Sequence, residues 1–100
     1  MTAAANGPSY HIDMSQQNRM ILKLLHLQAA HKGTGPRFVA AFRQMVEHLR
    51  QDPLNFGEPL YHLPILKLQV RLGVVDHLVV VYGVHLERSL VIIRNFKVLS

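Results

Sequence analysis

The chain has 100 residues, of which 49% are hydrophobic, and it contains no cysteine. This length fits a single compact domain with a modest core, and the lack of cysteine excludes disulfides and thiolate metal sites. Eleven Lys and Arg against six Asp and Glu give a formal net charge of +5, which favours polyanions or an acidic protein as partners.

Two features of the sequence bear on the cellular location of the protein: its first residues and its longest apolar run. Residues 1–5 lack the basic and then apolar pattern of a secretory signal. The run over residues 78–82 is far shorter than the roughly 20 residues that cross a bilayer. We therefore expect a soluble, cytoplasmic protein that does not enter the membrane. A disordered extension is predicted over residues 1–9 and a single domain over residues 10–100.

Within residues 10–52, two helices are predicted to form a hairpin. A strand candidate at residues 10–14, which is short and contains an aspartate, precedes them. The first helix runs from about Ser15 to Lys32, with Ser15 as its N-cap and Gly33 as its C-cap. The second helix has Pro36 in its first turn, where a missing N–H costs no hydrogen bond, and it stops before Pro53.

Three strands are predicted after residue 60. Residues 66–72 alternate apolar and polar, which is typical of a strand with one face on a core and one in water, and residues 73–76 follow as a turn. Residues 78–82 are apolar on both faces, which indicates a central strand. The third strand spans residues 90–97. Short loops between the three predict an antiparallel meander, so the fold class is α+β with three or four strands.

Four cations are predicted on the sheet: Lys67, Arg71, Arg94 and Lys97. Lys67 and Arg71 share the polar face of the alternating strand, so neighbouring strands would concentrate positive charge there. Phe96 lies between two of these cations, a pattern that suits base stacking beside phosphate contacts, although it could equally anchor the last strand. His85, in a loop beside the basic face, could reach a bound phosphate. Ordinary solubilising side chains are the alternative reading of each cation.

Three segments carry a resemblance to a known family: the junction from Leu49 to Leu60, the strand from Lys67 to Arg71 and the strand from Leu78 to Val84. With the predicted hairpin ahead of them, they resemble the RelE/ParE toxin superfamily over most of residues 10–98. The resemblance implies a β-α-α-β-β-β fold in which a helical hairpin packs on a mainly antiparallel sheet.

The resemblance also implies a bacterial toxin of a type II toxin–antitoxin pair, neutralised by an acidic antitoxin. Its target would be mRNA on the ribosome, cut by an endonuclease, or DNA gyrase. The nuclease branch holds the scissile phosphate with basic residues, a role that falls to Lys67, Arg71 and Arg94, with Phe96, Lys97 and His85 as further contacts. Gln69 and Val79 stand where that branch carries other cations.

Two alternatives stay open beside the toxin. One is a binding module for protein or nucleic acid on the same fold, without catalysis. The other is an oligomerising domain, such as a homodimer held by a strand edge or an apolar helix stripe. The seven histidines have no metal-ligand spacing, so we expect neither a metal nor a cofactor.

Overall fold

The computed structural model of the protein describes residues 9–99, so most of the predicted N-terminal extension lies outside the described residues. The elements in chain order are β1 (His11–Asp13), α1 (Gln16–His31), α2 (Gly35–Gln51), α3 (Pro53–Phe56), β2 (Glu58–Leu63), β3 (Leu68–Val75), β4 (Leu78–His85) and β5 (Leu90–Val98). None of the described helices has the length and apolar character that crossing a membrane would need.

The five strands form one mixed sheet in the order β1-β5-β4-β3-β2, with β1 parallel to β5 and the other pairs antiparallel. This confirms the α+β class and the strand ahead of the first helix. The sheet nevertheless has one strand more than the highest number predicted. The extra strand is β2, whose first residues belong to the junction from Leu49 to Leu60; as an edge strand, β2 tolerates Pro59.

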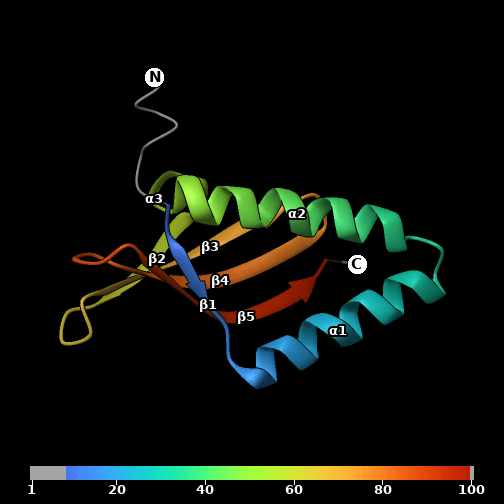
Figure 1. The fold of residues 1–100 in the computed structure, drawn as a ribbon, viewed down its shortest axis with the longest axis horizontal. Helices are drawn as coiled ribbons and strands as arrows, with labels where there is room; N and C mark the ends of the chain where they lie inside the picture. The colour runs from blue at the N-terminus through green and yellow to red at the C-terminus, as the bar shows by residue number, and fades with distance from the viewer. Residues whose placement is uncertain (1–8, 100) are drawn as a thin grey trace.

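Local capping explains where the two long helices begin and end. The Ser15 hydroxyl accepts a hydrogen bond from the Asn18 N–H at 3.1 Å, as an N-cap should. Gly33, just beyond α1, has φ +81°, a conformation that glycine adopts at no steric cost. The Asn18 side chain also donates to the carbonyl of Ile93 at 3.2 Å, so the start of α1 is tied to β5 beyond the short β1. Figure 1 shows α1 beside the end of β5, while α2 runs along the sheet.

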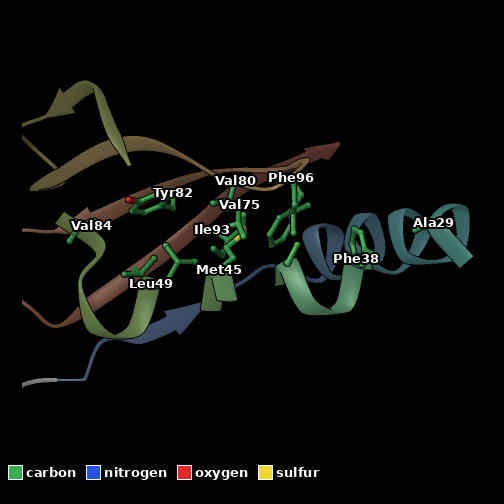
Figure 2. Packing of buried hydrophobic residues seen from close by; sticks show 13 residues of the cluster. Ala29, Phe38, Met45, Leu49, Val75, Val80, Tyr82, Val84, Ile93 and Phe96 are labelled. Carbon is green, nitrogen blue, oxygen red and sulfur yellow. The ribbon is translucent and has the colours of Figure 1, made fainter. Parts of the chain in front are cut away.

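The core lies between α2 and one face of the sheet. Side chains of α2 that recur at helical spacing are buried here: Phe38, Ala41, Met45 and Leu49. They meet buried residues of β4 and β5, among them Val80, Tyr82 and Phe96, as Figure 2 shows. β4 is buried on both faces, as the sequence predicted.

β3 differs from the predicted strand in its bounds and in which of its residues face the core. The strand runs from Leu68 to Val75, so the predicted turn at residues 73–76 is wrong, and the turn lies at Asp76 and His77 instead. A glycine belongs inside this strand because a Cβ on Gly73 would collide with the ring of Phe56. Arg71 pairs with Tyr82 of the core face, so Gln69 and Arg71 face the helices together with Val75 at the end of β3. The other apolar residues of β3 face away from the helices: Leu68, Val70, Leu72 and Val74.

Candidate functional site

The predicted cations of the sheet do not gather at one place. Lys67 lies in the turn before β3 with φ +55°, and its Nζ is 2.9 Å from both carboxylate oxygens of Glu87. Both side chains of this pair are more than half exposed, and such surface pairs contribute about 0 to 1 kcal/mol. Lys67 is thus neutralised at a loop, and it does not share a strand face with Arg71.

Arg71 is a buried structural residue. Its side chain is only 7% exposed; it donates to the carbonyl of Gly57 and, at 2.6 Å, to the Oε1 atom of Gln69. No carboxylate of the described residues forms an ion pair with it, and its Nε atom has no partner. Tyr82 holds the same junction, because its hydroxyl accepts from Gly57 N–H and donates to the Pro53 carbonyl at 2.7 Å. The guanidinium of Arg71 therefore donates its hydrogen bonds to groups of this chain, the Gly57 carbonyl and the Gln69 side chain.

The remaining predicted site residues lie apart from Lys67 and Arg71. Arg94 is exposed at the irregularity in the β4–β5 register, and Lys97 is exposed beside Val79. Phe96 is 4% exposed and contacts Phe42 edge to face, so its ring is part of the core. His85, at the end of β4, accepts a hydrogen bond through Nδ1 from the N–H of Glu87. These positions do not converge on a single pocket.

Two alanine variants test whether Arg71 stabilises this end of the sheet and whether Lys67 does not. We expect Arg71→Ala to lower the free energy of unfolding by about 2 kcal/mol, because hydrogen bonds from a charged group are lost and the Gly57 carbonyl loses a partner. Lys67→Ala should change it by less than about 1 kcal/mol, as for other exposed pairs. Urea unfolding measures both values, and equal effects would contradict these assignments.

The positive charge of the protein resides on the helical hairpin. Residues 16–51 hold six of the eleven Lys and Arg but one acid, Glu47, so this segment alone carries the formal +5. The other residues hold five Lys and Arg and five acids, and they are neutral overall. The sequence predicted a concentration of positive charge on the sheet, whereas the charge is concentrated on the hairpin. The net charge of each segment of the sequence, taken separately, would have indicated that the hairpin is the basic part of the chain.

A groove with a volume of about 580 Å³ lies between α1 and α2. Arg19 and Lys23 of α1 line it, and neither forms an ion pair within residues 9–99. Its apolar wall includes Phe38 and Phe42 of α2, and the ring of His26 stacks on Phe38 with centroids 5.6 Å apart. The groove thus combines aromatic surface with unpaired cations.

An exposed apolar stripe on α1 extends this surface. Met20, Leu24 and Leu27 recur at helical spacing and are 51%, 54% and 62% exposed. Met20 also lines the groove, so the stripe and the groove are continuous. We call the groove and this stripe together the hairpin surface. An apolar strip flanked by cations is the complement of an acidic amphipathic helix.

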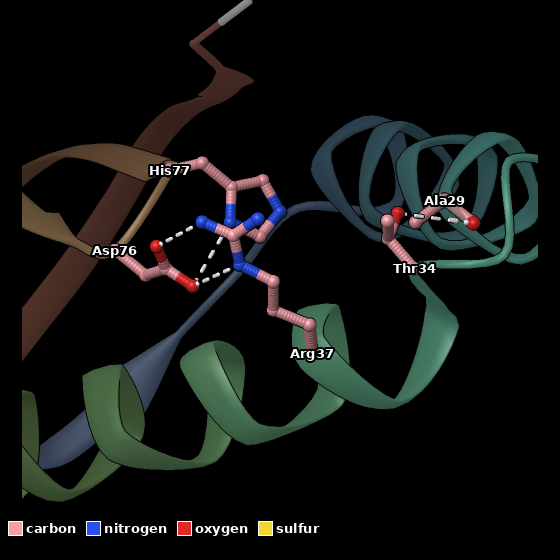
Figure 3. Close-up of polar contacts among 5 residues, drawn as sticks. All are labelled: Ala29, Thr34, Arg37, Asp76 and His77. Atoms are coloured by element: carbon pink, nitrogen blue, oxygen red, sulfur yellow. Dashed lines mark hydrogen bonds and ion pairs between the residues drawn. The ribbon is translucent and has the colours of Figure 1, made fainter.

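One hairpin cation is already neutralised by the sheet. Arg37 of α2 binds both carboxylate oxygens of Asp76, in the β3–β4 turn, at 2.6 Å (Figure 3). The hydrogen bond from the Arg37 guanidinium holds the pKa of Asp76 at about 2, below its ordinary 3.8. His77 Nδ1 lies 3.4 Å from the same carboxylate. This pair fastens the start of α2 to the sheet and leaves the cations at the groove free.

The Arg37–Asp76 pair predicts a loss of stability in acid. Because the carboxylate is ionised more readily in the folded state, its stabilisation is present above the ordinary pKa of 3.8 and is lost as the pH falls toward 2. The melting temperature of the native protein should therefore exceed that of Asp76→Asn at neutral pH. This difference should close between pH 4 and pH 2, and thermal melts across that range measure it.

Comparisons with protein-family models, curated proteins and solved structures find no match to this chain. The assignment of function therefore depends on the geometry and charge of the chain itself.

Proposed function

We propose that this protein is a toxin-like protein of the RelE/ParE type that acts in the bacterial cytoplasm by binding a protein, and that an acidic antitoxin segment docks on its hairpin surface. The observation that carries the proposal is the confinement of the +5 charge to the hairpin, around an apolar groove. The order of elements, with a helical hairpin between β1 and the antiparallel strands, supports the family assignment.

The hairpin surface suits a partner helix for two physical reasons. Apolar side chains of the partner would bury against Phe42 and Leu24, and burial of apolar area supplies most of the affinity of such helix-in-groove contacts. Acidic side chains at its edges would meet Arg19 and Lys23, which speeds association and selects against basic partners. The apolar groove favours a protein partner over a nucleic acid, which would need cations but no apolar stripe.

RNA cleavage is the less favoured branch of the family. Cleavage by a ribose hydroxyl needs cations held around one phosphate together with a group that takes the proton. Lys67 is paired with Glu87, Arg71 is buried under Gly57, and Arg94 is exposed on another strand. DNA gyrase, or another protein, is accordingly the target that we favour over mRNA.

Induced expression in a bacterial host tests this function. We expect growth arrest without new mRNA 5′ ends, relieved when the acidic protein encoded by an adjacent gene is expressed with it. New ribosome-dependent 5′ ends that disappear in Lys67→Ala would contradict the proposal and favour the nuclease. Unimpaired growth would also contradict it and favour a binding module without toxicity on the same fold.

A further inference from the structure

The side of the sheet opposite α2, which we call the helix-free face, is apolar. Alternate residues of the strands point to it, because their neighbours belong to the core on the other side. Its middle is formed by the paired Leu72 and Val81, which are partly exposed, while Val70 and Val79, 0% and 3% exposed, lie toward its two ends. Further apolar side chains of the face are partly or half-exposed: Tyr61, Val74 and Ile92.

We propose that the helix-free face is the interface of a homodimer, in which the sheets of two copies pack face to face. Alternating apolar residues on a sheet face are typical of surfaces that pack on a second sheet. Charge favours a second copy at this face. The register places on this face Glu58, Asp13 and Lys97, which are charges of both signs, so two such faces can attract each other, whereas two hairpin surfaces would repel.

The charges on this face also define how the two copies are oriented. Glu58 lies on the β2 edge strand and Lys97 on β5, and both are exposed without an ion-pair partner within residues 9–99. A two-fold axis parallel to the strands, between the sheets, puts β2 of one copy over β5 of the other. Glu58 then faces Lys97 of the second copy, twice per dimer. An axis perpendicular to the strands through their middle would instead put Glu58 over Glu58 of the second copy, and only Lys97 would lie near an acid, Asp13.

The register permits this pairing. Glu58 is level with Leu72, Val81 and Asn95 across the sheet, and Lys97 is two residues beyond Asn95. At about 3.3 Å per residue the offset is about 7 Å, which two long side chains can span. The other acid on this face near β5 is Asp13, which is level with Ile92 and therefore at the opposite end of the strand from Lys97.

The area of the face predicts a weak dimer. Four strands about 4.8 Å apart and about six residues long cover roughly 400 Å² in projection. A standard stable interface buries about 800 Å² per partner. The dimer should therefore dissociate in the micromolar range, and the protein should exchange between monomer and dimer on dilution.

Sedimentation velocity on the full chain, from about 5 to about 500 μM, tests the interface. We expect the native protein to shift from monomer to dimer over this range. Val74→Glu should weaken the dimer at least about tenfold, because it buries a charge in the interface, while the monomer keeps that half-exposed side chain in water. Leu24→Glu, an equal change at a half-exposed residue of the hairpin surface, is the matched control and should leave the dimer intact.

A charge exchange tests the orientation. Glu58→Lys and Lys97→Glu should each weaken the dimer about threefold to tenfold, since each sets two like-charge contacts in place of two attractive ones. The double variant should recover to within about twofold of the native protein. A native protein that is monomeric throughout, or a dimer that Leu24→Glu dissociates and Val74→Glu does not, would overturn the interface. Failure of the double variant to recover would overturn the axis parallel to the strands.

Circular dichroism melts of each variant separate loss of association from loss of folding. The growth assay of the proposed function is independent, since it tests the hairpin on another surface of the molecule. A toxin that is always monomeric would overturn only the dimer, and a dimer without toxicity would overturn only the toxin.

Discussion

Replacing Arg19 and Lys23 with glutamate is expected to weaken binding of the acidic partner that we propose by at least about 100-fold, because attractive contacts at the groove become repulsive ones. Both side chains lie on the exposed surface of α1 and have no ion-pair partner within residues 9–99, so the fold should tolerate the change. Isothermal titration calorimetry with the proposed acidic partner measures the affinity. The native affinity should also fall as salt is raised.

The matched control is Lys67→Glu with Arg88→Glu. This pair changes the total charge by the same amount, but both residues are exposed in the β2–β3 and β4–β5 connections, at the end of the sheet away from α1 (Figure 1). Binding should stay within about threefold of the native value, since charges separated by more than about 10 Å are largely screened at ordinary salt. Equal losses in the two double variants would mean that total charge, rather than the hairpin surface, governs binding, and would contradict the docking site.

Tyr82→Phe is expected to lower the free energy of unfolding by about 2 to 3 kcal/mol, or roughly 10 to 20 °C in melting temperature for a domain of this size. The tyrosine is 0% exposed, and its hydroxyl pairs with the Gly57 N–H and the Pro53 carbonyl, which phenylalanine would leave unpaired. Tyr61→Phe, at a half-exposed position on β2, should stay within about 0.5 kcal/mol of the native protein. Equal effects in the two variants would contradict the role given to the hydroxyl.

The same tyrosine predicts a change at high pH. Burial raises the pKa of Tyr82 above its ordinary 10.0, against the hydrogen bond from Gly57. The stabilisation is therefore present below pH 10 and is lost as the pH rises through the pKa of the folded state. The stability difference between native protein and Tyr82→Phe should narrow in that range, as urea unfolding at pH 9 to 11 would measure.

Features set by neighbouring residues could be predicted from the sequence. Ser15 caps α1 and Gly33 follows it with positive φ, as their residue types predict. Proline in the first turn of α2, and Pro53 after its end, bound that helix by local sterics alone. The central position of β4 followed from its apolar character on both faces.

Features set by distant contacts could not be predicted. The alternation in β3 has the correct period, but the orientation of its faces depends on what covers them. Gly73 continues the strand because the Phe56 ring, stacked against His48, lies over it, and Arg71 points to the helix side because Gly57 offers it a carbonyl. Phe56 and Gly57 lie 14 or more residues from these partners, so no local pattern reveals the contacts.

The predicted site failed to assemble for the same reason. Lys67 and Arg71 were expected to share the water-facing side of one alternating strand. Lys67 lies instead in a turn, and Arg71 is buried beneath the junction at Gly57. The charge that was expected on the sheet is instead on helices whose sequence shows it directly: α1 contains no acidic residue, and α2 contains only Glu47.

The most direct test of the proposed docking site is an NMR titration of the isotopically labelled protein with the proposed acidic partner. Amide shifts should change along α1 and α2, around Lys23 and Phe42, and should stay small along β3 and β5. Shifts centred on the strands, with α1 and α2 unperturbed, would contradict the assignment of the hairpin surface as the docking site.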